Sequence, residues 1–170
     1  MVARLTTGKA KYKEVEEECW QVIEEGEKLR QSLTEAIELD AKSFEGILIA
    51  RRLPRDTEDN LRIRENAIME ASFTAAAVPL HTAQMCLQAM KLALRMAQIG
   101  NLSAISDAAS GVFQAQAGLE SAFLNVEINL LGYENESIAA GLLNQSRDLK
   151  QESEGIITEL KTLLKERAGL

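Results

Sequence analysis

The chain has 170 residues, of which 46% are hydrophobic and 26% are charged, and its formal net charge is −7 at pH 7. This length suffices for one domain with its own core, and we treat residues 1–170 as a single domain. The negative charge argues against nucleic acids and anionic membranes as partners, because both bind basic surfaces. A local basic cluster could still bind a small anionic substrate.

The cysteines and the N-terminus predict a cytoplasmic protein. Cys19 and Cys86 lie far apart and match no metal-binding spacing, so we expect two reduced, buried thiols and no metal site. The polar N-terminus lacks the apolar core of a signal peptide. No stretch approaches the roughly 20 apolar residues that cross a membrane.

Helical periodicity dominates and strand signals are nearly absent, which predicts an all-α fold. Residues 1–8 are expected to end a helical segment near Gly8. Residues 11–52 predict one helix of roughly 60 Å, which we expect to bend, to break near Gly26 or to pack across a dimer. Its apolar stripe contains Trp20, Ile23, Gly26, Leu29 or Arg30, Leu33, Ile37, Asp40, Phe44 and Ile47.

Proline and glycine mark the next boundaries. Pro54 breaks the first long helix, and Thr57 is expected to cap a second one that runs to about Ile99. Pro79 lies inside that helix and predicts a kink, because its ring removes a hydrogen-bond donor. The dipeptide at residues 100–101, Gly-Asn, is typical of a helix end.

Two further helices complete the expected bundle. Ser103 or Ser106 is expected to cap a third helix that runs to about Leu131. A turn at residues 132–135 leads to a fourth helix over about 136–167. Few charges fall between residues 65 and 127, which predicts that the middle helices are buried by the rest of the chain or by a second subunit. The whole pattern indicates a bundle of long antiparallel helices.

Asp40 stands out because it places a carboxylate on an apolar stripe. Burying a carboxylate is costly unless it is paired, hydrogen-bonded or protonated. A group in such a setting is a candidate general acid/base. It can equally be a structural aspartate that bonds a helix end or an arginine, and the periodicity leaves both interpretations open.

Two polar features surround the start of the third helix. The segment Gly100-Asn101…Ser106-Asp107 joins a helix end to a helix start, and simple capping accounts for most of it. One face of the helix is small and polar without being mostly charged, which suits either a ligand groove or a polar dimer seam, and both remain open. The face contains Asp107, Gly111, Gln114, Gly118, Ser121, Asn125 and, one turn on, Asn129.

These residues resemble the formimidoyltetrahydrofolate cyclodeaminase / methenyltetrahydrofolate cyclohydrolase family. The resemblance runs in order from Met1 to about Leu131, while the last helix fits more loosely. The stretch Met1–Tyr12 is similar to the family's Met-Val…Leu-Thr…Gly-Lys-Lys-Tyr segment. The other similar stretches are residues 40–44 (Asp-Ala-Lys-Ser-Phe), 52–55 (Arg-Leu-Pro-Arg), Arg64, 77–80 (Ala-Val-Pro-Leu), 100–107 (Gly-Asn…Ser-Asp) and 125–129 (Asn-Val-Glu-Ile-Asn).

The resemblance implies an all-α, intertwined homodimer with folate bound in a cleft near the dimer interface. It gives the catalytic role to Asp40. For the glutamyl carboxylates of the substrate, Lys9 or Arg64 is a candidate. The segments around the active site supply the remaining substrate-binding candidates, which are Gly100, Asn101, Ser106, Asp107, Asn125 and Asn129.

The implied enzyme belongs to one-carbon folate metabolism. In the cyclodeaminase reaction, N10 attacks the formimino carbon on N5 and ammonia leaves. In the cyclohydrolase reaction, water opens the methenyl bridge to give 10-formyl-tetrahydrofolate. Both reactions move a proton at an amidine-like carbon, which a positioned carboxylate such as Asp40 can do. The expected substrate is a tetrahydrofolate derivative, with no cofactor or metal, and the sequence does not choose between the reactions.

The alternative hypothesis is a non-catalytic helical homodimer, an inactive or truncated member whose polar seam serves assembly. Family members usually carry a Pro/Gly-rich turn of Gly-Gly-Gly-Ser character and a helix of small residues before the Met-Val segment. The sequence begins after that turn, which predicts a truncated chain, a start codon assigned too late or a shortened member. The turn is expected to belong to the folate site.

Overall fold

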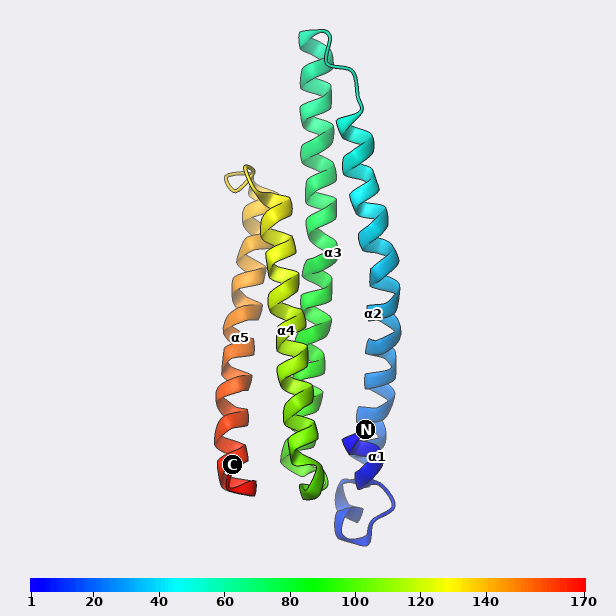
Figure 1. Ribbon diagram of the computed structural model, residues 1–170, viewed down its shortest axis with the longest axis vertical. Coiled ribbons are helices and arrows are strands. Elements are labelled where there is room, and N and C mark those ends of the chain that lie inside the picture. The colour runs from blue at the N-terminus through cyan, green and yellow to red at the C-terminus, as the bar shows by residue number, and fades with distance from the viewer.

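The computed structural model describes residues 1–170 as helices joined by short loops, with no strand. Figure 1 shows the long helices side by side in the order α5, α4, α3 and α2, with the chain running alternately up and down. The predicted all-α bundle of long antiparallel helices is therefore confirmed. The elements are α1 (Val2–Thr6), η1 (Ala10–Val15), α2 (Glu16–Arg51), α3 (Glu58–Ile99), η2 (Leu102–Ala104), α4 (Ile105–Leu130) and α5 (Ser137–Ala168).

Helix α2 begins later than the sequence predicted. Residues 10–15 form a 3₁₀ turn in which Tyr12 leaves the helical region, with φ −115° and ψ 18°. The Tyr12 hydroxyl accepts a hydrogen bond from the Leu102 N–H at 3.1 Å, which holds this turn against the loop before α4. From Glu16 the helix is continuous for 36 residues, so the break considered near Gly26 does not occur.

Helix α3 begins and continues as its residues dictate. The Thr57 side chain accepts a hydrogen bond from the Asn60 N–H at 3.2 Å, which confirms the predicted cap. The helix then runs through Pro79 without interruption. Proline lacks an N–H, so the Ala75 carbonyl loses its helical donor. The Asn129 side-chain amide of α4 donates to that carbonyl at 3.1 Å, and this bond replaces the missing one.

The predicted caps of α4 are wrong. Its N-cap is Ala104, which has no capping side chain, and neither Ser103 nor Ser106 fills that role. The reason is the extra turn η2, which the Asn101 side chain caps by accepting a hydrogen bond from the Ser103 N–H at 3.2 Å.

The core lies where α3, α4 and α5 meet, with α1 and part of α2 added at one end. Small residues let these helices approach closely, because a Cβ added at Gly118 would lie only 3.1 Å from Cys86 Sγ. Cys19 and Cys86 are both buried free thiols, as predicted. A second, smaller cluster near the α4–α5 turn contains Ala76, Leu80, Val126, Leu130 and Ala139.

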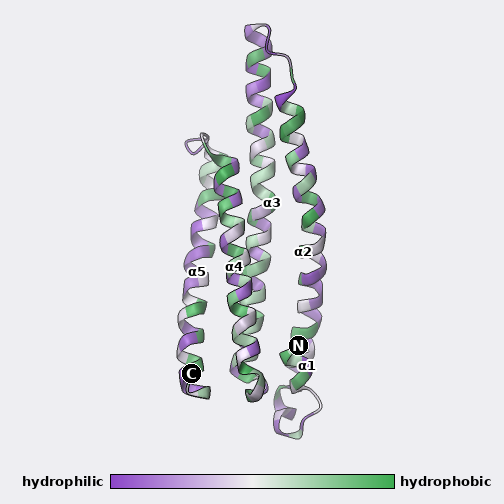
Figure 2. Ribbon diagram, in the orientation of Figure 1, coloured by the Kyte–Doolittle hydropathy of each residue, from purple (hydrophilic) through white to green (hydrophobic).

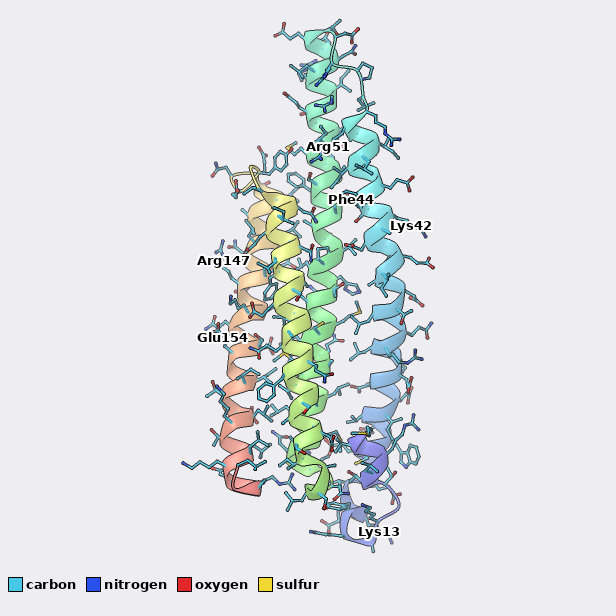
Figure 3. The ribbon with its side chains drawn as sticks, viewed as in Figure 1. Lys13, Lys42, Phe44, Arg51, Arg147 and Glu154 are labelled. Atoms are coloured by element: carbon cyan, nitrogen blue, oxygen red, sulfur yellow. The ribbon has the colours of Figure 1, made fainter.

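One part of the bundle has only two helices. The ends of α2 and α3 that meet at residues 52–57 project beyond α4 and α5, and Figure 3 places Arg51 in this projection. Figure 2 shows hydrophobic segments along it, and several of its large apolar side chains are exposed. None of the helices has a stretch long and apolar enough to span a lipid bilayer. The exposed apolar residues of the projection are Phe44, Leu48, Ile49, Leu61 and Ile63.

Candidate active site

A groove runs between α2 and α4. Helix α2 packs along α3 and against α1, whereas the backbones of α2 and α4 do not pack closely together. The space between them contains two cavities of about 500 Å³ and 310 Å³. Leu33 lines both cavities, so they are neighbouring parts of one groove. Each volume lies within the range of roughly 300–1,000 Å³ that is usual for small-molecule sites.

We call the smaller cavity the upper one, because it lies nearer the projecting ends of α2 and α3, and the larger cavity beside α1 the lower one. The upper cavity brings Asp40 together with the polar face of α4. The Asp40 carboxylate makes no hydrogen bond or ion pair within the chain, and the Ser43 hydroxyl bonds only its backbone carbonyl. The Asn125 side-chain amide donates to the Ser121 carbonyl at 3.0 Å, which leaves the Asn125 side-chain oxygen without a partner. The cavity is lined by Leu33, Ala36, Ile37, Asp40, Pro79, Thr82, Gly118, Ser121, Ala122 and Asn125.

The stripe of α2 is less buried in the single chain than its periodicity predicted. Asp40 is exposed, and so are its apolar neighbours Ile37 and Phe44, with exposed fractions of 71% and 55%. The reason is that α2 contacts α3 along another part of its surface and nothing in the chain covers this stretch. Within the single chain, Asp40 therefore bonds neither an arginine nor a helix end, and its catalytic interpretation stays a prediction.

The larger, lower cavity contains charged groups on both walls. On the α2 wall, the Glu27 carboxylate accepts a hydrogen bond from Arg30 Nε at 2.8 Å and pairs with Arg4 Nη2 at 3.4 Å. The Arg30 guanidinium, and to a lesser extent that of Arg4, lowers the pKa of the Glu27 carboxyl. Asp107 lies on the α4 wall together with Gly111. The remaining lining is mainly apolar and includes Val2, Val22, Ile23, Leu29, Leu33, Leu92 and Met96.

Gly100 and Asn101 hold α1 in place and do not line either cavity. A Cβ at Gly100 would lie 2.5 Å from the Met96 carbonyl oxygen and 3.1 Å from Val2, so only glycine fits this close approach. The Asn101 N–H donates to the Thr6 hydroxyl at 2.9 Å, and its side-chain amide donates to the Leu5 carbonyl at 3.2 Å. Since α1 forms part of the lower cavity wall, these residues shape the groove indirectly.

Four other predicted site residues lie outside the groove. Asn129 bonds Ala75 on α3, and Ser106 is exposed in the first turn of α4. Lys9 is exposed in the loop after α1, whereas Arg64 is at the opposite end of the molecule, where its Nε donates to the Arg51 carbonyl at 3.2 Å. The structure therefore brings together Asp40 and Asn125 in one cavity and places Asp107 in the next.

Several groove residues were missed by sequence reasoning. Pro79 and Thr82 come from α3, whose orientation toward the groove could not be read from its own periodicity. Arg30 had a usable signal, because it occupies the same α2 stripe as Asp40 and is likewise charged. Chemically, the groove offers an unpaired carboxylate at one end and apolar walls along its length. At the other end it offers two guanidinium groups together with the carboxylates of Glu27 and Asp107.

Comparison with known proteins identifies the family. The family model of formiminotransferase-cyclodeaminase matches residues 1–148. The methenyltetrahydrofolate cyclohydrolase of Methylorubrum extorquens is 40% identical over 153 residues, which cover 90% of this chain and 74% of that protein. The formimidoyltransferase-cyclodeaminase of Sus scrofa is 28% identical over 153 residues, which are 90% of this chain but only 28% of that longer protein.

A solved structure agrees on the fold. The formiminotetrahydrofolate cyclodeaminase of Thermotoga maritima superimposes with a TM-score of 0.85, covering 98% of this chain and 79% of that one at 24% identity. The family match covers residues 1–148, which include most of the five-helix fold and both walls of the groove between α2 and α4. The chain belongs to the formiminotransferase-cyclodeaminase family of folate one-carbon proteins.

Proposed function

We propose that the chain is an enzyme that hydrolyses 5,10-methenyl-tetrahydrofolate to 10-formyl-tetrahydrofolate, with Asp40 as general acid/base. The observation that carries the proposal is the unpaired Asp40 carboxylate, which lines the upper cavity opposite the amide of Asn125. The similarity to the M. extorquens cyclohydrolase, the relative with the higher identity, favours hydrolysis.

Asp40 serves both halves of this reaction. It removes a proton from the attacking water as the new C–O bond forms at the methenyl carbon. It then returns a proton to N5 as the C–N5 bond breaks, and the second proton of the water passes to solvent when the formyl carbonyl forms. A carboxylate in this position also stabilises the delocalised positive charge of the methenyl bridge.

The cyclodeaminase reaction is the second candidate, because the family description and the animal relatives name it. Here N10 forms the bond to the formimino carbon and the bond to the departing nitrogen breaks. The formimino group reacts as its protonated amidinium. Asp40 would move the proton from N10 to the departing nitrogen, so that ammonia leaves and the positive charge remains on the methenyl bridge. Both reactions use the same carboxylate at the same carbon, and only the supplied substrate distinguishes them.

The remaining sequence-based site residues take different places within this proposal. Asn125 faces the reacting carbon with its unpartnered oxygen, which can orient the water or accept a pterin N–H. Asp107 lies in the neighbouring cavity. For Ser106, Asn129, Lys9 and Arg64, direct substrate contact stays a prediction. Gly100 and Asn101 are assigned to support of the groove wall through α1.

We further propose that two copies form a homodimer in the cytoplasm. Large apolar side chains are exposed on the projecting ends of α2 and α3 and on α4, where Leu124 and Ile128 have exposed fractions of 67% and 64%. Large exposed apolar side chains in such number are typical of protein–protein interfaces. A second copy packed there would also exclude water from Asp40. A monomeric mass in solution at micromolar protein concentration would refute the dimer.

The activity is tested with purified protein and methenyl-tetrahydrofolate, by following the loss of the methenyl absorbance above the spontaneous rate. We expect wild type to accelerate hydrolysis and Asp40→Asn to lower kcat by about 100-fold or more. Glu38→Gln is the matched control, because Glu38 pairs only with Lys42 on the outer side of α2 at 3.7 Å.

Formimino-tetrahydrofolate is assayed in parallel for ammonia release, and this choice of substrate decides between the two reactions. If wild type and Asp40→Asn both match the background rate with both substrates, the chain is no enzyme of this kind. The non-catalytic homodimer is then the correct alternative.

A further inference from the structure

The lower cavity carries a cluster of two arginines and one glutamate in which the hydrogen-bonding capacity of the arginines is mostly unused. One Glu27 carboxylate serves two guanidinium groups, through Arg30 Nε at 2.8 Å and Arg4 Nη2 at 3.4 Å. These three side chains therefore hold one positive charge in excess on their wall, and the Asp107 carboxylate on the α4 wall of the same cavity balances it. Each guanidinium has five N–H donors in a planar fork that matches a carboxylate. Only one nitrogen of each arginine is engaged, so both retain free donors at the cavity wall.

The cluster lies at a definite distance from Asp40. Positions 30, 33, 37 and 40 share one face of α2, so Arg30, Leu33 and Asp40 line the same groove. At a rise of about 1.5 Å per residue, Arg30 and Asp40 are roughly 15 Å apart along the helix axis. Between them the wall is apolar, with Leu33 common to both cavities.

We infer that Arg4 and Arg30 bind the glutamyl carboxylates of a folate whose one-carbon unit lies at Asp40. This assignment rests on the proposed function and adds the position of the substrate tail. In a folate, a benzoyl ring and the glutamyl backbone separate N10 from the carboxylates by roughly 10 Å. An arginine side chain reaches across the remaining distance, and the benzoyl ring packs on the apolar wall around Leu33.

The opposite orientation, with the pterin in the lower cavity on Asp107, does not fit. A carboxylate could accept the N–H pair of the amino-pyrimidine ring, but that edge lies only roughly 6 Å from N5. Asp107 precedes Gly118, the first α4 residue of the upper cavity, by roughly 16 Å along α4. A pterin on Asp107 would leave the one-carbon unit far from Asp40.

Glu27 has two effects on such a site. It orients both guanidinium groups toward the cavity wall, and it competes with an incoming carboxylate for their donors. Arg4 reaches the cavity only because α1 is held by Asn101, whose N–H and side-chain amide bond Thr6 and Leu5. The polar segment at the start of α4 thereby supports substrate binding without contacting the substrate.

The test compares two substrates that differ only in the tail, methenyl-tetrahydrofolate and methenyl-tetrahydropteroate, which lacks the glutamate. We expect Arg30→Met to raise KM for the first by about tenfold or more, since charge-assisted hydrogen bonds are lost. The KM of Arg30→Met for methenyl-tetrahydropteroate should stay unchanged, and so should its kcat with either substrate. Lys28→Met is the control, because Lys28 lies on the same helix, pairs with Glu24 at 2.6 Å and does not line the groove. Glu27→Gln should lower KM for methenyl-tetrahydrofolate only.

An equal change in KM for both substrates, or no change for either, overturns the assignment. If wild type hydrolyses neither substrate, the proposed function fails, and calorimetric binding of 4-aminobenzoyl-glutamate then decides the inference. Binding that Arg30→Met weakens by about tenfold, with no binding of 4-aminobenzamide, supports the tail site. Equal binding to both proteins, or no binding to wild type, refutes it.

Discussion

The two long sides of α4 behave differently although both are built from small or uncharged residues. Toward α3 and α5, side chains such as Val112 and Leu119 are fully buried in the core. Toward α2, Ser121 and Asn125 line an open groove. One side holds the fold together and the other is left for a ligand. On this single helix, stability and function should therefore be separable by choosing the side that is altered.

The largest effect is expected on the packed side. Leu119→Ala removes a side chain with 0% exposure and should lower the free energy of unfolding by about 2–5 kcal/mol. Ser121→Ala, two positions away on the groove side, should change it by less than about 0.5 kcal/mol. Urea unfolding followed by circular dichroism measures both. A similar loss in the two variants would show that the groove side is also packed, against another chain.

The next effect concerns the support of the groove wall. A methyl group at Gly100 collides with the Met96 backbone and with Val2, so Gly100→Ala should cost about 1–3 kcal/mol and loosen α1. Gly155→Ala in α5 is the control. Its Cβ meets nothing within 4 Å, so helix propensity should stabilise that variant by about 0.5–1 kcal/mol. Thermal unfolding should show a lower Tm than wild type for Gly100→Ala and a higher Tm for Gly155→Ala. Tm shifts of the same sign in both variants would contradict the close contact at Gly100.

Two asparagines one helical turn apart sharpen the comparison further. Asn129→Ala leaves the Ala75 carbonyl without a donor and should cost about 1–2 kcal/mol. Asn125→Ala removes only an exposed hydrogen bond to the Ser121 carbonyl within α4. The free energy of unfolding of this variant should therefore stay close to that of wild type. If Asn129→Ala unfolds like wild type but loses activity, the side chain contacts the substrate as the sequence predicted.

The smallest effect is a pH dependence at the α2–α3 contact. Arg95 bonds Glu18 through Nη2 at 2.9 Å, and this bond lowers the pKa of the Glu18 carboxyl from its ordinary value of 4.5. The ion pair therefore makes its full contribution to the free energy of unfolding above pH 4.5. This contribution is lost as the pH falls through the lowered pKa of Glu18 in the folded state. Because the pair is partly exposed, Glu18→Gln should cost less than about 1 kcal/mol at pH 7. The difference from wild type should vanish in acid, and a difference that persists there would exclude the ion pair as its cause.

Most of the secondary structure was predictable because local chemistry determines it. Thr57 with Asn60 and the Gly100-Asn101 pair mark ends that the structure confirms within a residue or two. The start of α2 was predicted too early, since the turn at residues 10–15 is held by a contact between Tyr12 and distant Leu102. Contacts of this kind have no local signature.

The candidate site was predictable only in part, for a related reason. The polar face of α4 was found from its spacing, and the groove confirms that Gly111, Gly118, Ser121 and Asn125 lie together on one side. The exposure of Asp40 was not predictable, because periodicity shows that a stripe exists but not which partner covers it. The role of Asn129 depends on the missing N–H of Pro79 in another helix, which the sequence of α4 alone does not reveal.

The docking of α1 has a practical consequence for anyone who prepares this protein. Met1 is exposed and yet lines the lower cavity, so any polypeptide joined ahead of it would start at the mouth of the groove. An affinity tag placed there would compete with ligands for the same space. Leu170 is also exposed and belongs to neither cavity, so purification handles belong at the C-terminus.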